Sequence, residues 1–165
     1  MYRLDHGLAP LALALGLAAC AGPPPPPPPT VANVSISAGS DMNPSASGAP
    51  APVVLRVYQL SSAAGFGNAE FFPLYNADAA TLGADIVKRE DIQLSPGDSK
   101  TLTINPADTV GAIGFFVGLR AFQSANWRAS ADLLPHRTTN IQLTLNHGGI
   151  ALKTQTLPAA AKTGP

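Results

Sequence analysis

Few residues in this sequence are of types and spacings that could do chemistry, and the most conspicuous is a single cysteine, Cys20. One thiol cannot form an internal disulfide, and it cannot build a cysteine-based metal site alone. The histidines His6, His136 and His147 are far apart and have no carboxylate cluster beside them, which argues against a metal site. No Gly-x-Ser-x-Gly nucleophile motif and no phosphate-binding glycine loop occurs. The residue types therefore favour a protein without enzymatic activity, cofactor or metal.

The position of Cys20 suggests what it does. An apolar run of ten residues, 8–17, lies before it near the N-terminus. Such a run matches the core of a signal peptide and is too short to span a bilayer as a helix. Leu17, Ala18 and Ala19, directly before the cysteine, resemble the lipobox of bacterial lipoproteins. In that motif the signal peptide is cut before the cysteine, which is then acylated. An ordinary signal peptide followed by a chance cysteine is the alternative.

The residues around Cys20 fit a lipid anchor and a tether. Two or three acyl chains hold a protein stably at a membrane, whereas one chain, at about 0.8 kcal/mol per buried methylene, holds it marginally. Ala21 is not the Asp of an inner-membrane retention signal, so we expect delivery to the outer membrane. Residues 23–29 are all proline, which predicts a polyproline II spacer of about 20 Å. Docking of a partner on this proline run stays an alternative.

Length and composition indicate one folded domain. The chain has 165 residues, of which 45% are hydrophobic and 12% charged, so it can bury a core and is not disordered. Its formal net charge is zero and its Lys and Arg residues are scattered, which argues against a nucleic-acid partner. We divide the chain into a signal peptide (1–19), an acylated cysteine with its tether (20–30), a β-sandwich domain (31–154) and a flexible tail (155–165).

The domain reads mostly as β-strands. Alternating or continuous apolar residues between turn signals predict about seven strands in two packed sheets. The predicted strands are residues 31–37, 53–60, 86–94, 101–104, 111–122, 138–145 and 150–154.

One segment, residues 69–82, breaks this pattern and predicts one or two short helices, limited in length by Pro73. We expect Phe71, Phe72 and Tyr75 to face the core; an exposed patch there would be a second candidate interface. Trp127 is expected to be a buried anchor, and Arg56, within an apolar strand, to pair with a carboxylate.

The longest loop lies between the first two predicted strands, at residues 38–52. It has 15 residues of small and turn-forming types, and loops of this length in a compact domain are usually functional or disordered. Its three prolines restrict the unfolded chain, so ordering it at an interface costs less. An insertion without a role is the alternative.

Several segments, in this order and spacing, resemble the type VI secretion lipoprotein family, known as TssJ, VasD or Lip. The resemblance covers residues 31–153, and no single motif is diagnostic. The segments are residues 35–38 with 40–44, 52–60, 70–72 with 74–75, 82–85, 94–97 and 125–128.

The resemblance implies a transthyretin-like β-sandwich with added helices, in an outer-membrane lipoprotein that faces the periplasm. It implies binding to the periplasmic C-terminal region of the IcmF-like inner-membrane subunit, TssM, in a complex that also contains TssL. In that family the loop between the first two strands contacts the partner. Here the expected contacts are Ser40, Asp41, Met42, Asn43, Pro44, Ser45, Ala46, Ser47 and Gly48. A periplasmic carrier of a small apolar ligand is the alternative function, and a deep apolar pocket would favour it.

Overall fold

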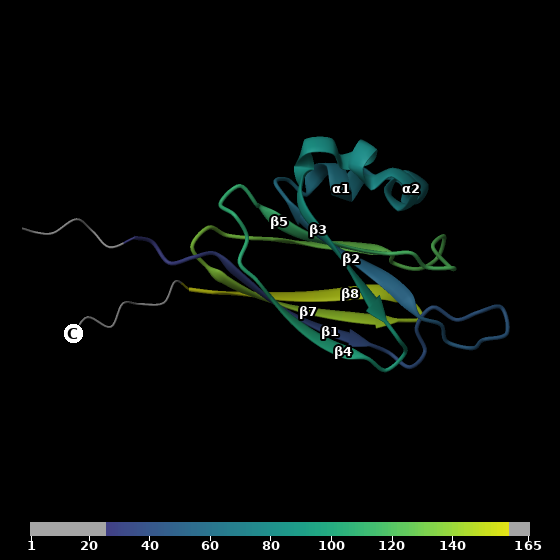
Figure 1. The fold of residues 1–165 in the computed structure, drawn as a ribbon. Coiled ribbons are helices and arrows are strands. Elements are labelled where there is room, and N and C mark those ends of the chain that lie inside the picture. Colours follow the sequence, from purple (N-terminus) through teal and green to yellow (C-terminus); the bar gives the residue numbers. More distant parts are fainter. Residues whose placement is uncertain (1–25, 159–165) are drawn as a thin grey trace, which may run out of the picture.

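A computed structural model describes residues 26–158, which form two four-stranded sheets packed face to face (Figure 1). The first sheet has the strand order β4-β1-β7-β8 and the second has the order β3-β2-β5-β6. The strands are β1 (Val31–Ala38), β2 (Val53–Leu60), β3 (Ile86–Leu94), β4 (Ser99–Ile104), β5 (Ala112–Val117), β6 (Arg128–Asp132), β7 (Thr138–Asn146) and β8 (Gly149–Leu157). The predicted lipidation residue Cys20 and the lipobox residues Leu17, Ala18 and Ala19 lie outside the described residues.

The sandwich core follows from side chains that alternate along the strands. In β1, Ala32, Val34 and Ile36 are buried, and β1 runs parallel to β7 with Val34 opposite Ile141. Because alternate side chains point to opposite faces of a sheet, this register places both apolar rows between the sheets. Twenty-two buried residues form one cluster there. The predicted two-sheet β-sandwich is therefore confirmed.

The structure has eight strands in residues 26–158, and β6 is the one that the prediction of about seven strands missed. Its sequence, RASAD, has no large apolar residue, and only Ala131 in it is buried. Pairing with β5 rather than an alternating pattern makes it a strand. The fifth predicted strand was also too long, since β5 ends at Val117.

The helices lie between β2 and β3, as predicted, and cover the outer face of the second sheet (Figure 1). They are α1 (Ala64–Asn68), α2 (Phe71–Leu82) and the 3-10 turn η1 (Gly83–Asp85). Pro73 is tolerated because it lies in the first turn of α2, where its missing N–H is not needed. The backbone of α2 is kinked at Ala77. Within residues 26–158, no helix is long and apolar enough to cross a membrane.

A second hydrophobic cluster joins the helices to the sheet. Phe66 of α1, Leu74 of α2 and Phe116 of β5 belong to it, and all three are buried. Because β5 packs against the sandwich core on one face and against the helices on the other, all six of its residues are buried. The prediction of core-facing aromatic residues was wrong for Phe72 and Tyr75, whose exposed fractions are 56% and 47%.

Candidate protein-binding surface

The loop between β1 and β2, residues 39–52, projects from one end of the sandwich (Figure 1). The described chain enters β1 at the opposite end. Near the loop's tip, the Ser45 amide donates to the Ala49 carbonyl and the Gly48 amide donates to the Ser45 carbonyl. Gly48 has a φ of 82°, a conformation that glycine adopts without strain. The tip is thus a local turn that is closed by its own backbone hydrogen bonds.

The base of the loop is held by the domain. Met42 is fully buried in the sandwich core, and Asn43 is 7% exposed. The Oδ1 of Asn43 accepts a hydrogen bond of 3.0 Å from the Arg120 amide, and its Nδ2 donates to the Pro52 carbonyl at 3.5 Å. Met42 and Asn43, which we expected to contact a partner, therefore have side chains that position the loop.

The other seven expected contact residues are accessible to solvent. Pro44 and Ser45 are half-buried, and five are exposed: Ser40, Asp41, Ala46, Ser47 and Gly48.

A second attachment joins the loop to the turn between β7 and β8. The Asp41 carboxylate lies 2.8 Å from Nδ1 of His147. This hydrogen bond lowers the pKa of Asp41 below its ordinary value. The sequence gives no sign of this contact, because Asp41 and His147 are 106 positions apart. The contact leaves the single acidic group of the loop already engaged.

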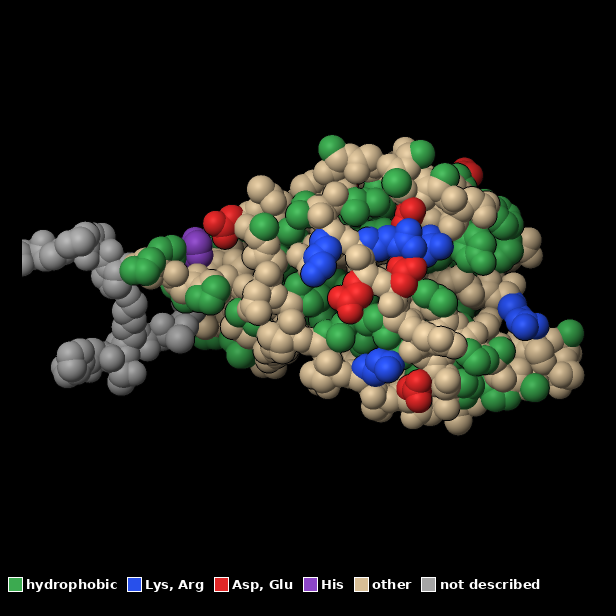
Figure 2. All heavy atoms as spheres, in the orientation of Figure 1, with side chains coloured by type: hydrophobic (Ala, Val, Ile, Leu, Met, Phe, Trp, Pro, Cys, Tyr) green, Lys and Arg blue, Asp and Glu red, His purple; other side chains and the backbone are tan. Residues whose placement is uncertain are grey.

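An aromatic cluster lies beside the loop, where α2 meets the segment between β5 and β6. Trp127 packs partly buried against both hydrophobic clusters, and the Arg128 guanidinium lies 4.5 Å from its ring centroid. Figure 2 shows hydrophobic side chains gathered on the surface near this end of the molecule. The cluster consists of Phe71, Phe72, Tyr75, Phe116, Phe122 and Trp127.

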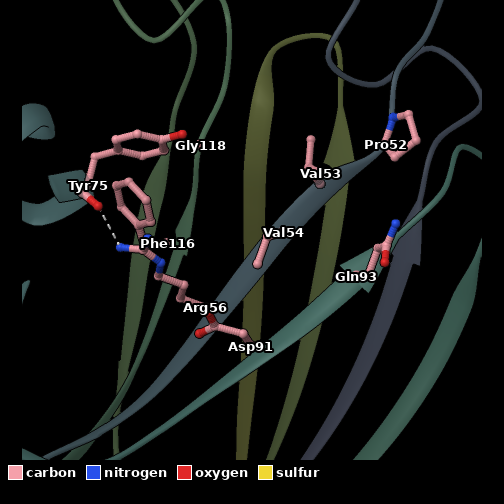
Figure 3. A pocket seen from close by; sticks show the side chains of 9 residues that line it. All are labelled: Pro52, Val53, Val54, Arg56, Tyr75, Asp91, Gln93, Phe116 and Gly118. Atoms are coloured by element: carbon pink, nitrogen blue, oxygen red, sulfur yellow. Dashed lines mark hydrogen bonds between the residues drawn. The ribbon is translucent and has the colours of Figure 1, made fainter.

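An open groove of about 340 Å³ runs from the end of the loop to α2 across the outer face of the second sheet (Figure 3). Pro52, the last residue of the loop, lines one end, and Tyr75 of α2 lines the other. The remaining lining residues are Val53, Val54, Arg56, Asp91, Gln93, Phe116 and Gly118. The groove is shallow and partly charged, so it does not resemble the deep apolar pocket that a carrier of apolar ligands needs.

Arg56 lies in this groove and holds α2 in place. Its Nη1 donates to the carbonyls of Leu74 and Tyr75, at 3.1 and 3.0 Å. Its guanidinium also lies 5.4 Å from the Phe116 ring centroid, within cation–π range. The predicted carboxylate partner is Asp78, at 3.9 Å. Arg56 is therefore a bridge between β2 and the kinked helix.

Asp78, a buried residue of α2, is the centre of a polar network that joins this helix to β2 and β3. Its Oδ2 accepts hydrogen bonds of 2.7 Å from the Tyr58 hydroxyl and from Nη1 of Arg89. Burial alone would raise the pKa of Asp78, but the Tyr58 hydrogen bond and the Arg89 charge outweigh it and lower that pKa. Burial, together with the bond to Asp78, raises the pKa of Tyr58.

These pKa directions have a chemical consequence. A general acid or base works best with a pKa near the working pH, whereas here Asp78 stays ionised and Tyr58 stays protonated across the neutral range. Asp91 also stays ionised across the neutral range, because its hydrogen bonds from Arg89 lower its pKa. The network is therefore suited to holding α2 on the sheet. Among residues 26–158, no group of three or more His, Cys, Asp or Glu side chains could hold a metal ion.

Comparison with known proteins gives a consistent result. The sequence model of the family described as "Type VI secretion lipoprotein, VasD, EvfM, TssJ, VC_A0113" matches residues 30–148. No curated protein matches the sequence.

Among solved structures, the fold is similar to the type VI secretion lipoprotein TssJ1 from Pseudomonas aeruginosa. The two share 31% identity with a TM-score of 0.74, over 79% of this chain and 100% of that one. It is also similar to Serratia marcescens Lip, a membrane-bound component of the type VI secretion system, with 25% identity and a TM-score of 0.70, over 77% and 98% of the chains. A chain in a structure of the TssM C-terminal domain from EAEC shares the fold, with 24% identity and a TM-score of 0.61, over 78% and 98%. The match over residues 30–148 and the likeness to TssJ1 confirm the resemblance found in the sequence, and this chain belongs to the type VI secretion lipoprotein family.

Proposed function

We propose that this protein is the non-enzymatic outer-membrane lipoprotein of a type VI secretion membrane complex. Acyl chains on Cys20 anchor it, and the domain faces the periplasm. Its loop, through the solvent-accessible residues among 40–48, binds the periplasmic C-terminal region of the IcmF-like subunit TssM. The protein thereby ties a complex that also contains TssL to the outer membrane.

The observation that carries the proposal is that the described chain, from residue 26, enters β1 at the end of the sandwich opposite the loop (Figure 1). A strand of this length spans about 26 Å, at roughly 3.3 Å per residue. An anchor on Cys20 therefore directs the loop away from the lipid, toward a partner that rises from the inner membrane. The polyproline II spacer expected at residues 23–29 adds about 20 Å to this distance.

The chemistry of the loop supports a protein partner. Met42 and Asn43 fix its base, so the accessible residues are presented by a supported loop and lose less conformational entropy on binding. Anchoring in the same envelope also raises the effective concentration of loop and partner, which increases occupancy without further contacts. No observation in residues 26–158 favours the small-ligand carrier, because side chains fill the space between the sheets.

The anchor is tested by mass spectrometry of the protein purified from native cells. We expect a mature chain that begins at Cys20 and carries acyl chains, and a Cys20→Ser variant that no longer fractionates with the outer membrane. An unmodified thiol on a chain that washes out of the envelope would contradict the proposal.

The loop is tested by binding of the full-length protein, in detergent, to the purified periplasmic region of TssM. In the loop-tip variant, the exposed residues Ala46 and Ala49 are both replaced by Glu, which leaves Met42 and Asn43 intact. The matched control has Glu at the exposed residues Ala107 and Thr109, in the turn between β4 and β5. We expect the loop-tip variant to bind at least about tenfold more weakly and the control to bind normally. Equal binding by both would remove the loop from the proposed interface.

A further inference from the structure

Three aromatic side chains form an accessible surface beside the loop, here called the aromatic shelf: Phe72, Tyr75 and Phe122. Phe72 is 56% exposed, Tyr75 is 47% exposed, and Phe122 is half-buried. Hydrophobic side chains gather visibly at this end of the molecule in Figure 2. Single exposed apolar residues are common, but large aromatic rings grouped on one surface indicate a contact site.

The rings of the shelf are held in place by one another and by Phe71, which lies next to them. Phe71 stacks on Phe122 with centroids 4.3 Å apart, and Phe72 meets Phe122 edge-on at 5.1 Å. Phe71 also stacks on Tyr75 at 5.6 Å. Each such pair adds about 0.5–1.5 kcal/mol beyond the burial of area. Because the rings are already ordered, a partner that binds them immobilises few side chains.

The backbone beneath the shelf is shaped to keep Tyr75 where it is. A Cβ atom at Gly118 would lie 2.8 Å from the Tyr75 ring, so only glycine leaves room for this ring position. In addition, Nη1 of Arg56 donates a hydrogen bond to the Tyr75 carbonyl. Tyr75 and Gly118 also line the groove that ends at Pro52 of the loop (Figure 3). The shelf is therefore continuous with the loop through this groove.

A cation without a partner lies between the loop and the shelf. Arg120 is exposed, and within residues 26–158 its side chain makes no hydrogen bond and no ion pair. Its backbone amide is bound by Asn43 at the base of the loop, and Phe122 follows two residues later. By contrast, Arg56 and Arg128 donate to backbone carbonyls. A free guanidinium beside aromatic rings is suited to a carboxylate that arrives with an apolar side chain.

We infer that the loop and the aromatic shelf form one interface, and that the shelf binds a segment of the partner in which a large apolar side chain lies next to an acidic one. This inference rests on the proposed function, because it assigns the shelf to the same partner that the loop binds. The apolar side chain packs on Phe72 and Phe122, and the carboxylate pairs with Arg120.

The test measures the affinity of full-length protein, in detergent, for the purified periplasmic region of TssM by biolayer interferometry. The shelf variants are Phe72→Ser and Arg120→Glu. Matched controls are Val87→Ser, at a residue 42% exposed on β3, and Lys100→Glu, at an exposed residue of β4. Each shelf variant is expected to raise the dissociation constant about tenfold or more, and each control less than about twofold. The Arg120→Glu effect should shrink between about 50 mM and about 500 mM salt. Circular dichroism checks that all variants fold.

The outcomes separate this inference from the proposed function. If the wild-type protein binds, the loop-tip variant fails and both shelf variants bind like their controls, the shelf is not part of the interface and the inference is overturned. If the wild-type protein does not bind TssM, the proposed function itself falls, and the inference falls with it. Self-association in sedimentation that Phe72→Ser and Arg120→Glu abolish would assign the shelf to a second copy of this chain and would also overturn the inference.

Discussion

Replacing Asn43 with Ala should destabilise the domain by about 2–4 kcal/mol. Asn43 is 7% exposed, and the substitution leaves the Arg120 amide and the Pro52 carbonyl without their partners. An unsatisfied buried backbone group costs about 1–3 kcal/mol, and the 3.5 Å bond to Pro52 is the weaker of the two. Asn43 also has a φ of 46°, a left-handed conformation that costs Ala about 1 kcal/mol more than it costs Asn.

Urea unfolding of the variants separates these contributions. Asn43→Gly loses both hydrogen bonds but adopts the positive φ freely, so its loss should be smaller than that of Asn43→Ala by about 1 kcal/mol. Asn43→Asp keeps an acceptor for the Arg120 amide and should lose least. A loss below about 0.5 kcal/mol for Asn43→Ala would refute the reasoning. An equal loss for Ala and Gly would show that backbone conformation has no part in it.

Three further predictions follow from the described contacts. Gly149→Ala should cost more than about 3 kcal/mol in urea unfolding, because Gly149 has a φ of 96° and a Cβ would overlap the Asn126 carbonyl oxygen. Gly67→Ala, where a Cβ meets nothing within 4 Å, should be neutral or stabilising, and an equal loss at both sites would contradict this account. The lowered pKa of Asp78 means that its ionised form stabilises the fold at neutral pH. This stability should be lost as the pH falls from the ordinary value of 3.8 toward the lower folded value, and Asp78→Asn should flatten that part of the stability curve in acid titration. His147→Ala should leave thermal unfolding unchanged but speed amide exchange at residues 39–42, whose contact through Asp41 it removes; unchanged exchange would show that Asn43 and Met42 alone fix the loop.

The sequence predicts the sandwich best where burial alternates with period two. β1 and β7 show that pattern, and both were found in place. β6 was missed because its paired partner, rather than its own side chains, makes it a strand. A pattern that records only burial cannot identify an edge strand of small and charged residues.

The prediction of which α2 residues face the core was wrong for Phe72 and Tyr75, and the reason is related. The buried residues of α2 are Leu74, Asp78 and Leu82, spaced by four. An aspartate in this row hides the apolar stripe from sequence reasoning, and Asp78 is tolerated there because Tyr58 and Arg89 satisfy its carboxylate. The aromatic residues that looked like the core-facing set are in part the ones left exposed.

The long loop between β1 and β2 was predictable from the sequence, but the burial of its individual residues was not. Loop length alone selected residues 38–52 as the element to consider. Which of its side chains are held by the domain depends on contacts with Arg120 and His147, which lie 77 and 106 positions away from their partners in the loop. Such long-range contacts leave no periodic signal, so Met42 and Asn43 were not separable from the exposed residues of the loop by sequence.

The parts of the proposed interface come from separate regions of the chain, and polar contacts join them into one surface. Asn43 fixes the loop to the segment that carries Arg120 and Phe122. Arg56 fixes the helix that carries Tyr75 to β2, whose first residue directly follows the loop. Both joints use buried or half-buried polar groups whose geometry is set by two elements at once. A partner would therefore meet a preformed surface, which lowers the entropic cost of association and makes the supporting residues matter as much as the contacting ones.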